Sequence, residues 1–496
     1  MTTATRQPRP TAALAAVTAV ITLALTIGPT SASADPPVGD ESAPVQDDPG
    51  PSVPLDMSQM EALEPSADAA IAIDCDQAAS LCIASILTDH PGYEELGGLE
   101  VGDQVPEQLL EAAHEDGAGQ ASDADQSTGS IAPQPSATEG TQPAPDQSTD
   151  AANGTVQRRG AARPALAAAP GRVPFPQECM TIALDKTLPG TSGTGKRTWV
   201  CAVKPWTVVL YSIRGNSAVV DGTAKFNLIQ YYRTNTRTRT VQAQIGVQLL
   251  SWTGKGTEVR INAQVSEQPG CKVASRRDLV DAQSITDYGS AELTSNVTRG
   301  KISDCFAKWN PRATATGYPL SSDFDLPPFH AARCDMVAMT ATPGCVVSEV
   351  PPTMTYGSST PTIARHIRNA QQQGLRGTLN NGPLHRTTSI TTSNLNGSRA
   401  CAGRPTVRGR SCDEYPFRST EEGLAQLSSA DYRARHDSAR RSFSFCSWPG
   451  LNRSTTGLIV TVCMVPVAEQ TAQSTTIRNF YRDWRVLNHD AFYVSA

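Results

Sequence analysis

The sequence predicts an α+β C-terminal domain that follows a β-rich accessory domain and an acidic, largely disordered N-terminal region. Charge separates the first region from the rest: residues 35–150 hold 25 Asp and Glu and no Lys or Arg, whereas residues 151–496 hold 40 Lys and Arg against 23 acids, a net of +17. Apolar and polar residues alternate in the middle of the chain, as half-buried strands require, and helical spacing appears after residue 360. The overall charge of −6 is therefore an average of two unlike parts, and it does not exclude a polyanionic partner.

The first 34 residues have the pattern of a secretory signal. Arg6 and Arg9 give a positive start, and residues 12–27 form an apolar run. The small residues Ala32-Ser33-Ala34 then provide a cleavage site. A retained membrane anchor is the alternative, but the run is short for a membrane span. We therefore expect a secreted, extracellular protein without a membrane segment after signal removal, in an oxidising compartment. The Arg-rich, Lys-poor composition is typical of a high-GC bacterium.

Residues 35–170 form the acidic region, and their Ala, Pro, Ser, Gln and Asp content predicts disorder over most of their length. Residues 69–87 are the one patch expected to order, with Cys75 and Cys82 placed to close a local loop. Arg158-Arg159 is either a protease site in a flexible linker or the start of the basic body. The acidic residues 35–150 either contact a basic cleft of the same chain, as a pro-segment that imitates a polyanion, or act as a solubilising spacer.

Residues 171–350 have the pattern of a β-rich accessory domain, and a β-sandwich is the expected architecture. Strand candidates recur between Gly, Asn and Pro turns at residues 207–213, 226–232, 241–250 and 258–265. The segment carries no catalytic signature. Its cysteines are expected to form structural bridges between sequence neighbours, although other pairings are open. They are Cys179, Cys201, Cys271, Cys305, Cys334 and Cys345.

Residues 351–496 combine helix and strand patterns. A helix begins at Thr360-Pro361, with proline at the first helical position, and ends at Gly374. A loop rich in Thr, Asn and Gly is expected next. Further strands are predicted at residues 443–448, 458–465 and 491–494, and a short helix at residues 477–484. The aromatic residues of 443–448 are interpreted as core rather than as a base-stacking surface. The segment has 17 Arg and no Lys, and Arg suits two-pronged contacts to phosphate.

The sharpest local feature is Cys-Asp-Glu-Tyr-Pro-Phe-Arg-Ser-Thr-Glu-Glu-Gly at residues 412–423. It places four carboxylates in an Arg-rich domain: Asp413, Glu414, Glu421 and Glu422. Carboxylates that hold Mg²⁺ or Mn²⁺ promote phosphodiester hydrolysis, since the metal polarises the phosphoryl oxygen and lowers the pKa of bound water. Arg side chains position the phosphate backbone. Surface ion pairs give the same pattern more often, so the residues alone leave both interpretations open.

This sequence resembles the central motif of the NucA/NucB-type secreted deoxyribonucleases, and both flanks support the resemblance. Upstream, residues 363–367 and Pro383-Leu384-His385-Arg386 resemble the family's helix and the Leu-x-Arg that follows it. Downstream, Val465-Pro466 resembles the end of a family strand, and residues 480–494 resemble the closing segment of actinobacterial members. The resemblance covers residues 355–496.

The resemblance implies a small metal-dependent nuclease fold, similar to a compact relative of the ββα-metal nucleases, that cuts DNA with little sequence specificity. It implies Mg²⁺ or Mn²⁺ binding and water activation for Asp413 and Glu414, without deciding which does which. It implies a further ligand or orienting role for Glu422. His385 is the better candidate general acid or base, because His366 is expected to be a half-buried helix residue. The candidate substrate-binding residues are Arg386, Arg410, Arg418 and Gln470.

The C-terminal cysteines lack the Cys-x-x-Cys spacing of zinc sites, so disulfides are the better interpretation. Arg399-Ala400-Cys401 resembles a family stretch whose Cys pairs with the Cys of the acidic motif. The resemblance therefore implies a bond from Cys401 to Cys412, which fixes the loop that enters the motif. A bond between Cys446 and Cys463 is expected to tie two predicted strands.

Two functions of different classes follow from these observations. The first is an extracellular endonuclease that hydrolyses DNA. The second is a secreted, non-catalytic protein that binds DNA, another polyanion or the cell surface through a degenerate nuclease domain. Leu424 and Gln470 motivate the second function, because the family usually has Gly and Asn there. A ribonuclease is a third candidate, since no feature of the sequence distinguishes ribose from deoxyribose in the substrate.

Overall fold

The structure is a computed structural model that describes residues 52–54, 71–87, 98–105, 171–188, 190–215, 217–266, 269–323, 326, 332–337, 342–451 and 457–496. All of them belong to one compact unit, Pro44–Ala496. The predicted signal sequence, Arg158-Arg159 and most of the acidic region lie outside the described residues. Within the described ranges, every helix is too short or too polar to cross a membrane.

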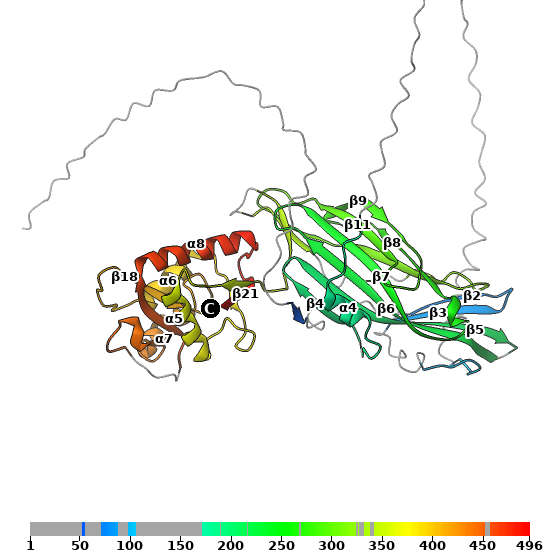
Figure 1. The fold of residues 1–496 in the computed structure, drawn as a ribbon, viewed down its shortest axis with the longest axis horizontal. Helices are drawn as coiled ribbons and strands as arrows, with labels where there is room; N and C mark the ends of the chain where they lie inside the picture. Colours follow the sequence, from blue (N-terminus) through cyan, green and yellow to red (C-terminus); the bar gives the residue numbers. More distant parts are fainter. Residues whose placement is uncertain are drawn as a thin grey trace, which may run out of the picture. The chain divides into compact units, whose positions relative to one another are not determined.

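The β-rich part is built on a large sheet with strand order β1-β4-β5-β6-β7-β11-β9, to which β3 adds by pairing with β5 and β2 by pairing with β3 (Figure 1). Its strands are β1 (Val53–Pro54), β2 (Ile71–Asp76), β3 (Leu81–Leu87), β4 (Ser192–Lys196), β5 (Trp199–Arg214), β6 (Ser217–Thr234), β7 (Thr240–Gly254), β9 (Cys271–Arg277) and β11 (Tyr288–Ser295). The strands predicted at residues 207–213, 226–232 and 241–250 are confirmed, and each is part of a longer strand.

Two smaller sheets accompany the large one. Their orders are β10-β8-β13 and β12-β14-β15. The strands are β8 (Arg260–Ser266), β10 (Leu279–Ala282), β12 (Ile302–Cys305), β13 (Lys308–Thr314), β14 (Ala332–Asp335) and β15 (Gly344–Val347), and the helical turns of this part are α4 (Gln177–Ala183) and η2 (Lys255–Glu258).

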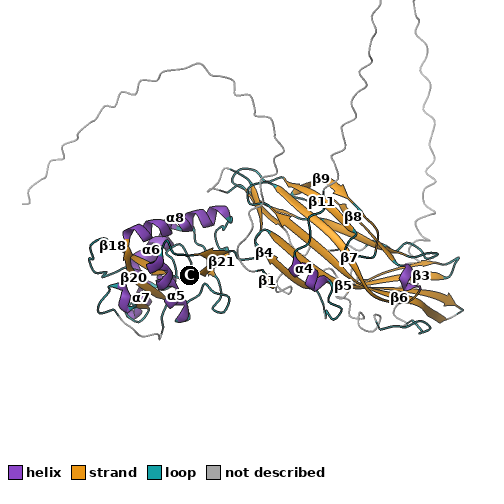
Figure 2. Ribbon diagram, viewed as in Figure 1, coloured by secondary structure: helices purple, strands orange, loops and turns teal. Residues whose placement is uncertain are grey.

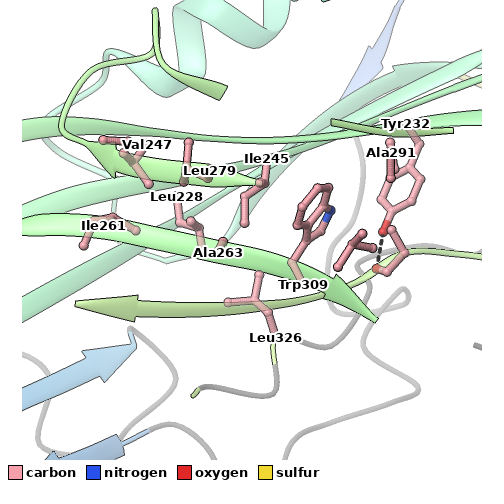
Figure 3. Packing of buried hydrophobic residues seen from close by; sticks show 14 of the residues in the cluster. Leu228, Tyr232, Ile245, Val247, Ile261, Ala263, Leu279, Ala291, Trp309 and Leu326 are labelled. Atoms are coloured by element: carbon pink, nitrogen blue, oxygen red, sulfur yellow. Dashed lines mark hydrogen bonds between the residues drawn. The ribbon is translucent and has the colours of Figure 1, made fainter. Parts of the chain in front are cut away.

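The main core of the β-rich part lies between the large sheet and the β10-β8-β13 sheet. Apolar residues of β6 and β7, such as Leu228 and Ile245, belong to one buried cluster with Ala263 of β8 and Trp309 of β13. Figure 3 shows these side chains meeting in the core. Two sheets that bury one face each against the other form the sandwich-like packing that the alternating strands predict.

Part of the acidic region joins this sheet. Strands β2 and β3 form a hairpin closed by the Cys75–Cys82 disulfide, as expected for the one patch predicted to order. Strand β3 also pairs with β5 from Leu81↔Ser212 to Leu87↔Trp206, and Ile83 and Ile86 are fully buried there. The described hairpin is therefore an integral edge of the β-rich sheet rather than a separate loop.

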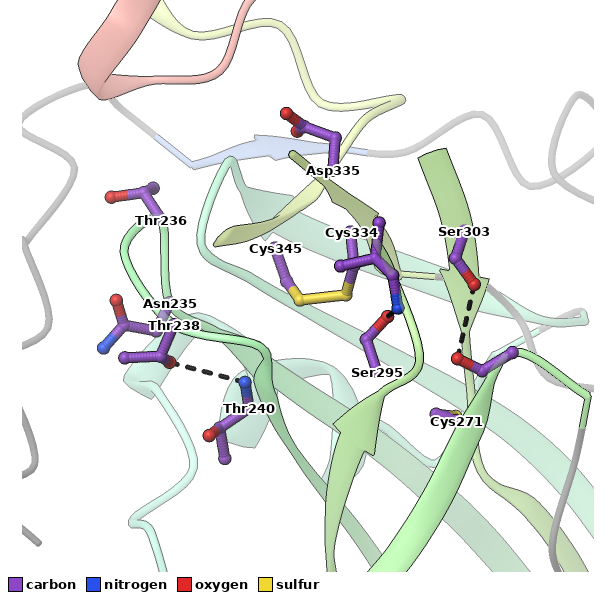
Figure 4. Close-up of a disulfide and its surroundings, with 12 residues drawn as sticks. Asn235, Thr236, Thr238, Thr240, Cys271, Ser295, Ser303, Cys334, Asp335 and Cys345 are labelled. Atoms are coloured by element: carbon purple, nitrogen blue, oxygen red, sulfur yellow. Dashed lines mark hydrogen bonds between the residues drawn. A yellow bond between two sulfur atoms is a disulfide. The ribbon is translucent and has the colours of Figure 1, made fainter. Parts of the chain in front are cut away.

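Two of the three expected neighbour pairings in the β-rich part are confirmed. Cys179 bonds to Cys201, and Cys334 to Cys345, which links β14 to β15 (Figure 4). The third pairing differs, because Cys271 and Cys305 are free and buried.

The C-terminal part contains the longer helices of the described chain (Figure 2) and two three-stranded sheets, β16-β21-β17 and β18-β20-β19. The helices are α5 (Pro361–Gln372), α6 (Ile390–Ala400), α7 (Ser429–Arg435), α8 (Val467–Asp483), η3 (Leu424–Gln426) and η4 (Ser444–Cys446). The strands are β16 (Thr353–Thr355), β17 (Leu384–His385), β18 (Arg410–Tyr415), β19 (Arg440–Ser442), β20 (Val460–Pro466) and β21 (Ala491–Ser495). The described chain is thus mixed, with a β-rich part followed by a part that contains helices and short strands, as predicted.

Two local predictions in this part were wrong, and one predicted helix is confirmed with an earlier start. The segment predicted as a strand at residues 443–448 is mainly the 3-10 turn η4, and Ser447 ends it with φ of 53°. The predicted loop after Gly374 contains α6, which Ser389 caps by accepting a hydrogen bond from Thr392 N. The helix predicted at residues 477–484 begins earlier, at Val467. Phe443 and Phe445 do pack against the core, as expected.

Candidate active site

The acidic motif begins on strand β18. This strand pairs antiparallel with β20, with Asp413 opposite Cys463 and Glu414 opposite Val462. Successive side chains of a strand point to opposite faces. The two acidic neighbours therefore leave β18 in opposite directions, and their surroundings differ accordingly.

Asp413 faces helix α5. Its Oδ2 lies 2.7 Å from Nδ1 of His366, and both side chains are buried. His366 belongs to the buried face of α5, between Ala364 and Ile367. The sequence indicated a half-buried helix residue, but the structure gives His366 a carboxylate partner 47 residues away. The second ring nitrogen, Nε2, is buried without a partner among the described residues.

Glu414 faces helix α6 on the other side of β18. It is only 9% exposed, and burial, followed by the charge of Asp413, raises its pKa to about 8. Arg418 acts in the opposite direction on this pKa. Gly397 of α6 lies against both groups, since a Cβ there would be 3.6 Å from Glu414 Oε1 and 3.6 Å from Arg418 Cζ.

Arg418 is exposed and held in place by helix α6. Its Nε donates to Ser393 Oγ at 3.1 Å, and its Nη2 donates to Asn394 Oδ1 at 2.8 Å. These neutral acceptors orient the guanidinium without neutralising it. An oriented, exposed guanidinium beside a buried carboxylate suits a contact to phosphate.

His385 and Glu422 form a second histidine–carboxylate pair. Glu422 Oε1 lies 2.6 Å from His385 Nδ1, and both carboxylate oxygens accept a hydrogen bond from His385 N at 3.1 Å. The imidazole is about one-third exposed. A carboxylate on Nδ1 fixes the orientation of the ring, which is the arrangement found in general-base pairs.

The other predicted contact residues have partners within the fold. Arg386 lies over the ring of Tyr481, with Cζ 4.4 Å from the centroid, and burial lowers its pKa. Arg410 donates to Met464 O at 2.7 Å. Gln470 donates to Gln473 Oε1 at 3.1 Å, and its own Oε1 is buried without a partner in the described part of the chain.

Backbone hydrogen bonds join the end of the acidic motif to β17. Glu421 N donates to His385 O at 3.0 Å, and Thr387 N donates to Ser419 O at 2.9 Å. Glu421 itself pairs with His489. The structure thus brings His385 and Glu422 together, whereas Asp413 and Glu414 lie on separate faces of their strand.

Both expected C-terminal disulfides are confirmed. Cys401 bonds to Cys412 and ties the end of α6 to β18. Cys446 bonds to Cys463, so it joins η4, rather than a strand, to β20. Cys401, Cys412 and Glu414 are close enough together to hold a metal ion, but the two sulfurs are bonded to each other and are not thiolate ligands.

The carboxylates fit an oxygen-ligated divalent ion better. Glu414 is a buried carboxylate that forms no ion pair with any residue that the structure describes. Burial raises the pKa of Glu414, and a divalent ion next to it would favour the charged form.

Residues 366–495 match a known family described as deoxyribonuclease NucA/NucB. No curated protein and no solved structure matches the chain. The match confirms the family resemblance of the C-terminal region. It includes β18 and both histidine–carboxylate pairs, so the site described above lies within the matched region.

Proposed function

We propose, from the premise that residues 366–495 form a deoxyribonuclease domain of the NucA/NucB family, that the protein is a secreted, metal-dependent endonuclease that hydrolyses DNA with little sequence specificity. The observation that carries the proposal is Glu414, a buried carboxylate with a raised pKa next to the exposed guanidinium of Arg418. A carboxylate can hold a metal ion that polarises the phosphoryl oxygen, and an arginine can contact the phosphate, so the pair suits phosphodiester hydrolysis.

Glu414 is the residue that we assign to Mg²⁺ or Mn²⁺. Asp413 already accepts a hydrogen bond from His366, whereas Glu414 forms no ion pair with a histidine or arginine of the described residues. The bound ion would polarise the phosphoryl oxygen and lower the pKa of water. Asp413 supports this ligand from the opposite face of β18 by holding His366 and helix α5 in place.

His385 is the residue that we assign to proton transfer. Glu422 holds its Nδ1, so Nε2 is the atom that would accept a proton from water. Arg418 contacts phosphate, and Arg386, stacked on Tyr481, supports β17 next to His385. Contacts of this kind recognise the backbone and carry no base information, which supports low sequence specificity.

Secretion is supported by the sequence and by the cysteines. Five disulfides occur among the described residues. Bonds of this kind persist in oxidising compartments, which agrees with the signal-like first 34 residues.

A non-catalytic DNA-binding protein is the second candidate. Gln470 replaces the usual Asn of the family and donates to Gln473, and Asp413 is bonded to His366. Comparing DNA binding with DNA cleavage in the double variant Asp413→Asn/Glu414→Gln separates the two functions. The endonuclease loses cleavage and keeps salt-sensitive binding. If the unchanged chain binds DNA but never cuts it with Mg²⁺ or Mn²⁺, the second candidate replaces the first.

A further inference from the structure

Residues 484–490, between α8 and β21, are held by arginines of the β-rich part. Arg197, in the turn before β5, is fully buried and donates from Nε to Trp484 O at 3.1 Å and from Nη2 to Arg485 O at 3.0 Å. Arg333 of β14 donates to the same Arg485 carbonyl at 2.7 Å. Two side chains from distant parts of the sequence thus bind the backbone of one short segment.

Asp490 is the charged centre of this contact. Its Oδ2 accepts from Arg197 Nη2 at 2.6 Å, and Arg333 forms a two-pronged contact at 2.6 Å and 2.7 Å. Burial alone would raise the pKa of Asp490, but the hydrogen bond and charge of Arg333 and the charge of Arg197 lower it to about 2. Asp490 is therefore ionised at every physiological pH.

A reciprocal ion pair adds to the contact. Arg485 extends in the other direction and pairs with Asp335 of β14 through Nε at 2.8 Å and Nη2 at 2.6 Å. Both side chains are 2% exposed. Buried ion pairs add little net stability, because desolvation offsets their attraction, but they fix one arrangement against others.

The segment held in this way sets the position of strand β17. Arg386 N donates to Asp490 O at 3.0 Å, and His489 N donates to Arg386 O at 2.8 Å. In the next step of the ladder, Ala491 is the register partner of His385. Asp490, whose carboxylate binds Arg197 and Arg333, thus directly precedes Ala491, the residue that pairs with His385.

We propose that the β-rich part positions the proton-transfer residue of the nuclease domain: Arg333 and Arg197, through Asp490, hold β21 and β17 and thereby place His385 against Glu422. This inference rests on the proposed function for the role of His385, whereas the positioning of β17 is independent of activity. Arg333 and Arg197 are positioning residues, since neither touches the groups assigned to the reaction.

The test uses the full chain with Arg333→Met and a matched control, Arg312→Met. Arg312 of β13 forms an ion pair with Asp323 in the same β-rich part. Arg333→Met should reduce kcat about 10- to 100-fold, since small displacements of a reacting group are costly, while KM for DNA changes less than about twofold. Arg333→Lys keeps the charge but not the two-pronged contact, so its loss should be intermediate. Arg312→Met should cleave as the unchanged protein does.

Hydrogen exchange provides a readout that does not depend on cleavage. The amides of Arg386 and His489 should exchange faster in Arg333→Met than in Arg312→Met, while the amides of β5 and β6 remain protected. Unchanged exchange at these two amides overturns the proposal, whether or not the protein cuts DNA. Faster exchange with an unchanged kcat overturns the link to His385. If the unchanged protein does not cut DNA, the proposed function fails, and exchange alone decides whether Arg333 positions β17.

Discussion

Two neighbouring carboxylates occupy different chemical environments in this protein. Asp413 is buried against His366, with 2.7 Å between its Oδ2 and Nδ1 of the imidazole. Glu414, on the other face of β18, is buried next to the negative charge of Asp413, and its pKa rises to about 8. The difference follows from strand alternation, which sends adjacent side chains to opposite faces.

Glu414→Gln separates catalysis from stability. It should reduce DNA cleavage about 100-fold or more, since a metal ligand contributes several kcal/mol to the transition state and each 1.36 kcal/mol is about tenfold. The folded pKa of Glu414 lies above its value of 4.5 in the unfolded chain, so the unchanged protein loses stability as pH rises from about 4.5 through 8. The variant lacks this loss.

Urea unfolding at pH 5 and pH 8 measures the effect on stability, and plasmid cleavage measures the effect on activity. Asp437→Asn is the control, because Asp437 is exposed and lies outside the site. A Glu414→Gln variant that cuts at the rate of the unchanged protein contradicts the assignment of the metal to Glu414.

At the residue scale, the sequence identified the motif but not its partners. Asp413, Glu414, Glu422 and His385 are named by a short pattern and its flanks. The pairing of His366 with Asp413 joins residues 47 positions apart, and only the packing of α5 on β18 brings them together. The sequence does place His366 inside the apolar stripe of α5. A buried histidine needs a hydrogen-bond partner, so this position indicates that one exists.

At the scale of elements, two disulfides of short span have different relations to the site. Cys401–Cys412 connects α6 to the strand that carries Glu414, whereas Cys75–Cys82 closes a hairpin of the β-rich sheet. Replacing either pair by alanine should cost roughly 2–4 kcal/mol of stability. Removing Cys401–Cys412 should also reduce cleavage at temperatures where the variant remains folded.

Circular dichroism melting and plasmid cleavage together test this prediction. Equal cleavage by the two disulfide variants, when both are folded, would mean that the Cys401–Cys412 bond does not position Glu414.

Strand β7 was predictable from the alternation of residues 241–249, and β5 from a continuous apolar run that is buried along almost its whole length. Helix α6 was missed because Ser, Thr and Asn dominate it, and these residues ordinarily favour turns and caps. The start of α8 was missed for a related reason. Its Thr and Ser hydroxyls bond to carbonyls four residues earlier, which a pattern of apolar residues does not reveal.

At the scale of the whole molecule, Asp490 makes the folding stability depend on pH in the acidic range. Its folded pKa of about 2 lies below the ordinary 3.8, so its contribution is present above pH 4 and is lost as pH falls through 2. Asp490→Asn should therefore be about 2 kcal/mol less stable than the unchanged protein near neutral pH. The two proteins should converge at pH 2. Urea unfolding across this range provides the measurement, and a difference that does not shrink in acid excludes the ion-pair explanation.

The acidic region gives a second prediction at this scale. The hairpin at residues 71–87 belongs to the β-rich sheet. A deletion that tests the charge of the acidic region must therefore spare these residues. Removing residues 106–157 deletes nine carboxylates and should raise DNA affinity at low salt if they cover a basic surface. The gain should shrink at high salt. Fluorescence anisotropy with labelled DNA measures both values, and equal affinities at low salt leave the spacer interpretation.

The division into an acidic and a basic part could be predicted from the sequence, since charge is a sum over residues. The docking of β3 on β5 could not, because it joins segments more than 100 residues apart through backbone hydrogen bonds that no side-chain pattern specifies. The same is true of the contact between Asp490 and Arg333.

The most direct test of the central claim is a plasmid assay with the full chain, which measures the conversion of supercoiled DNA to nicked and linear forms. The assay is run with Mg²⁺ or Mn²⁺, then with EDTA added, and then with the metal restored. We predict cleavage that stops with EDTA and returns with the metal. Cleavage that continues in excess EDTA would contradict the metal-dependent mechanism, and no cleavage under any of these conditions would contradict the assignment as a deoxyribonuclease.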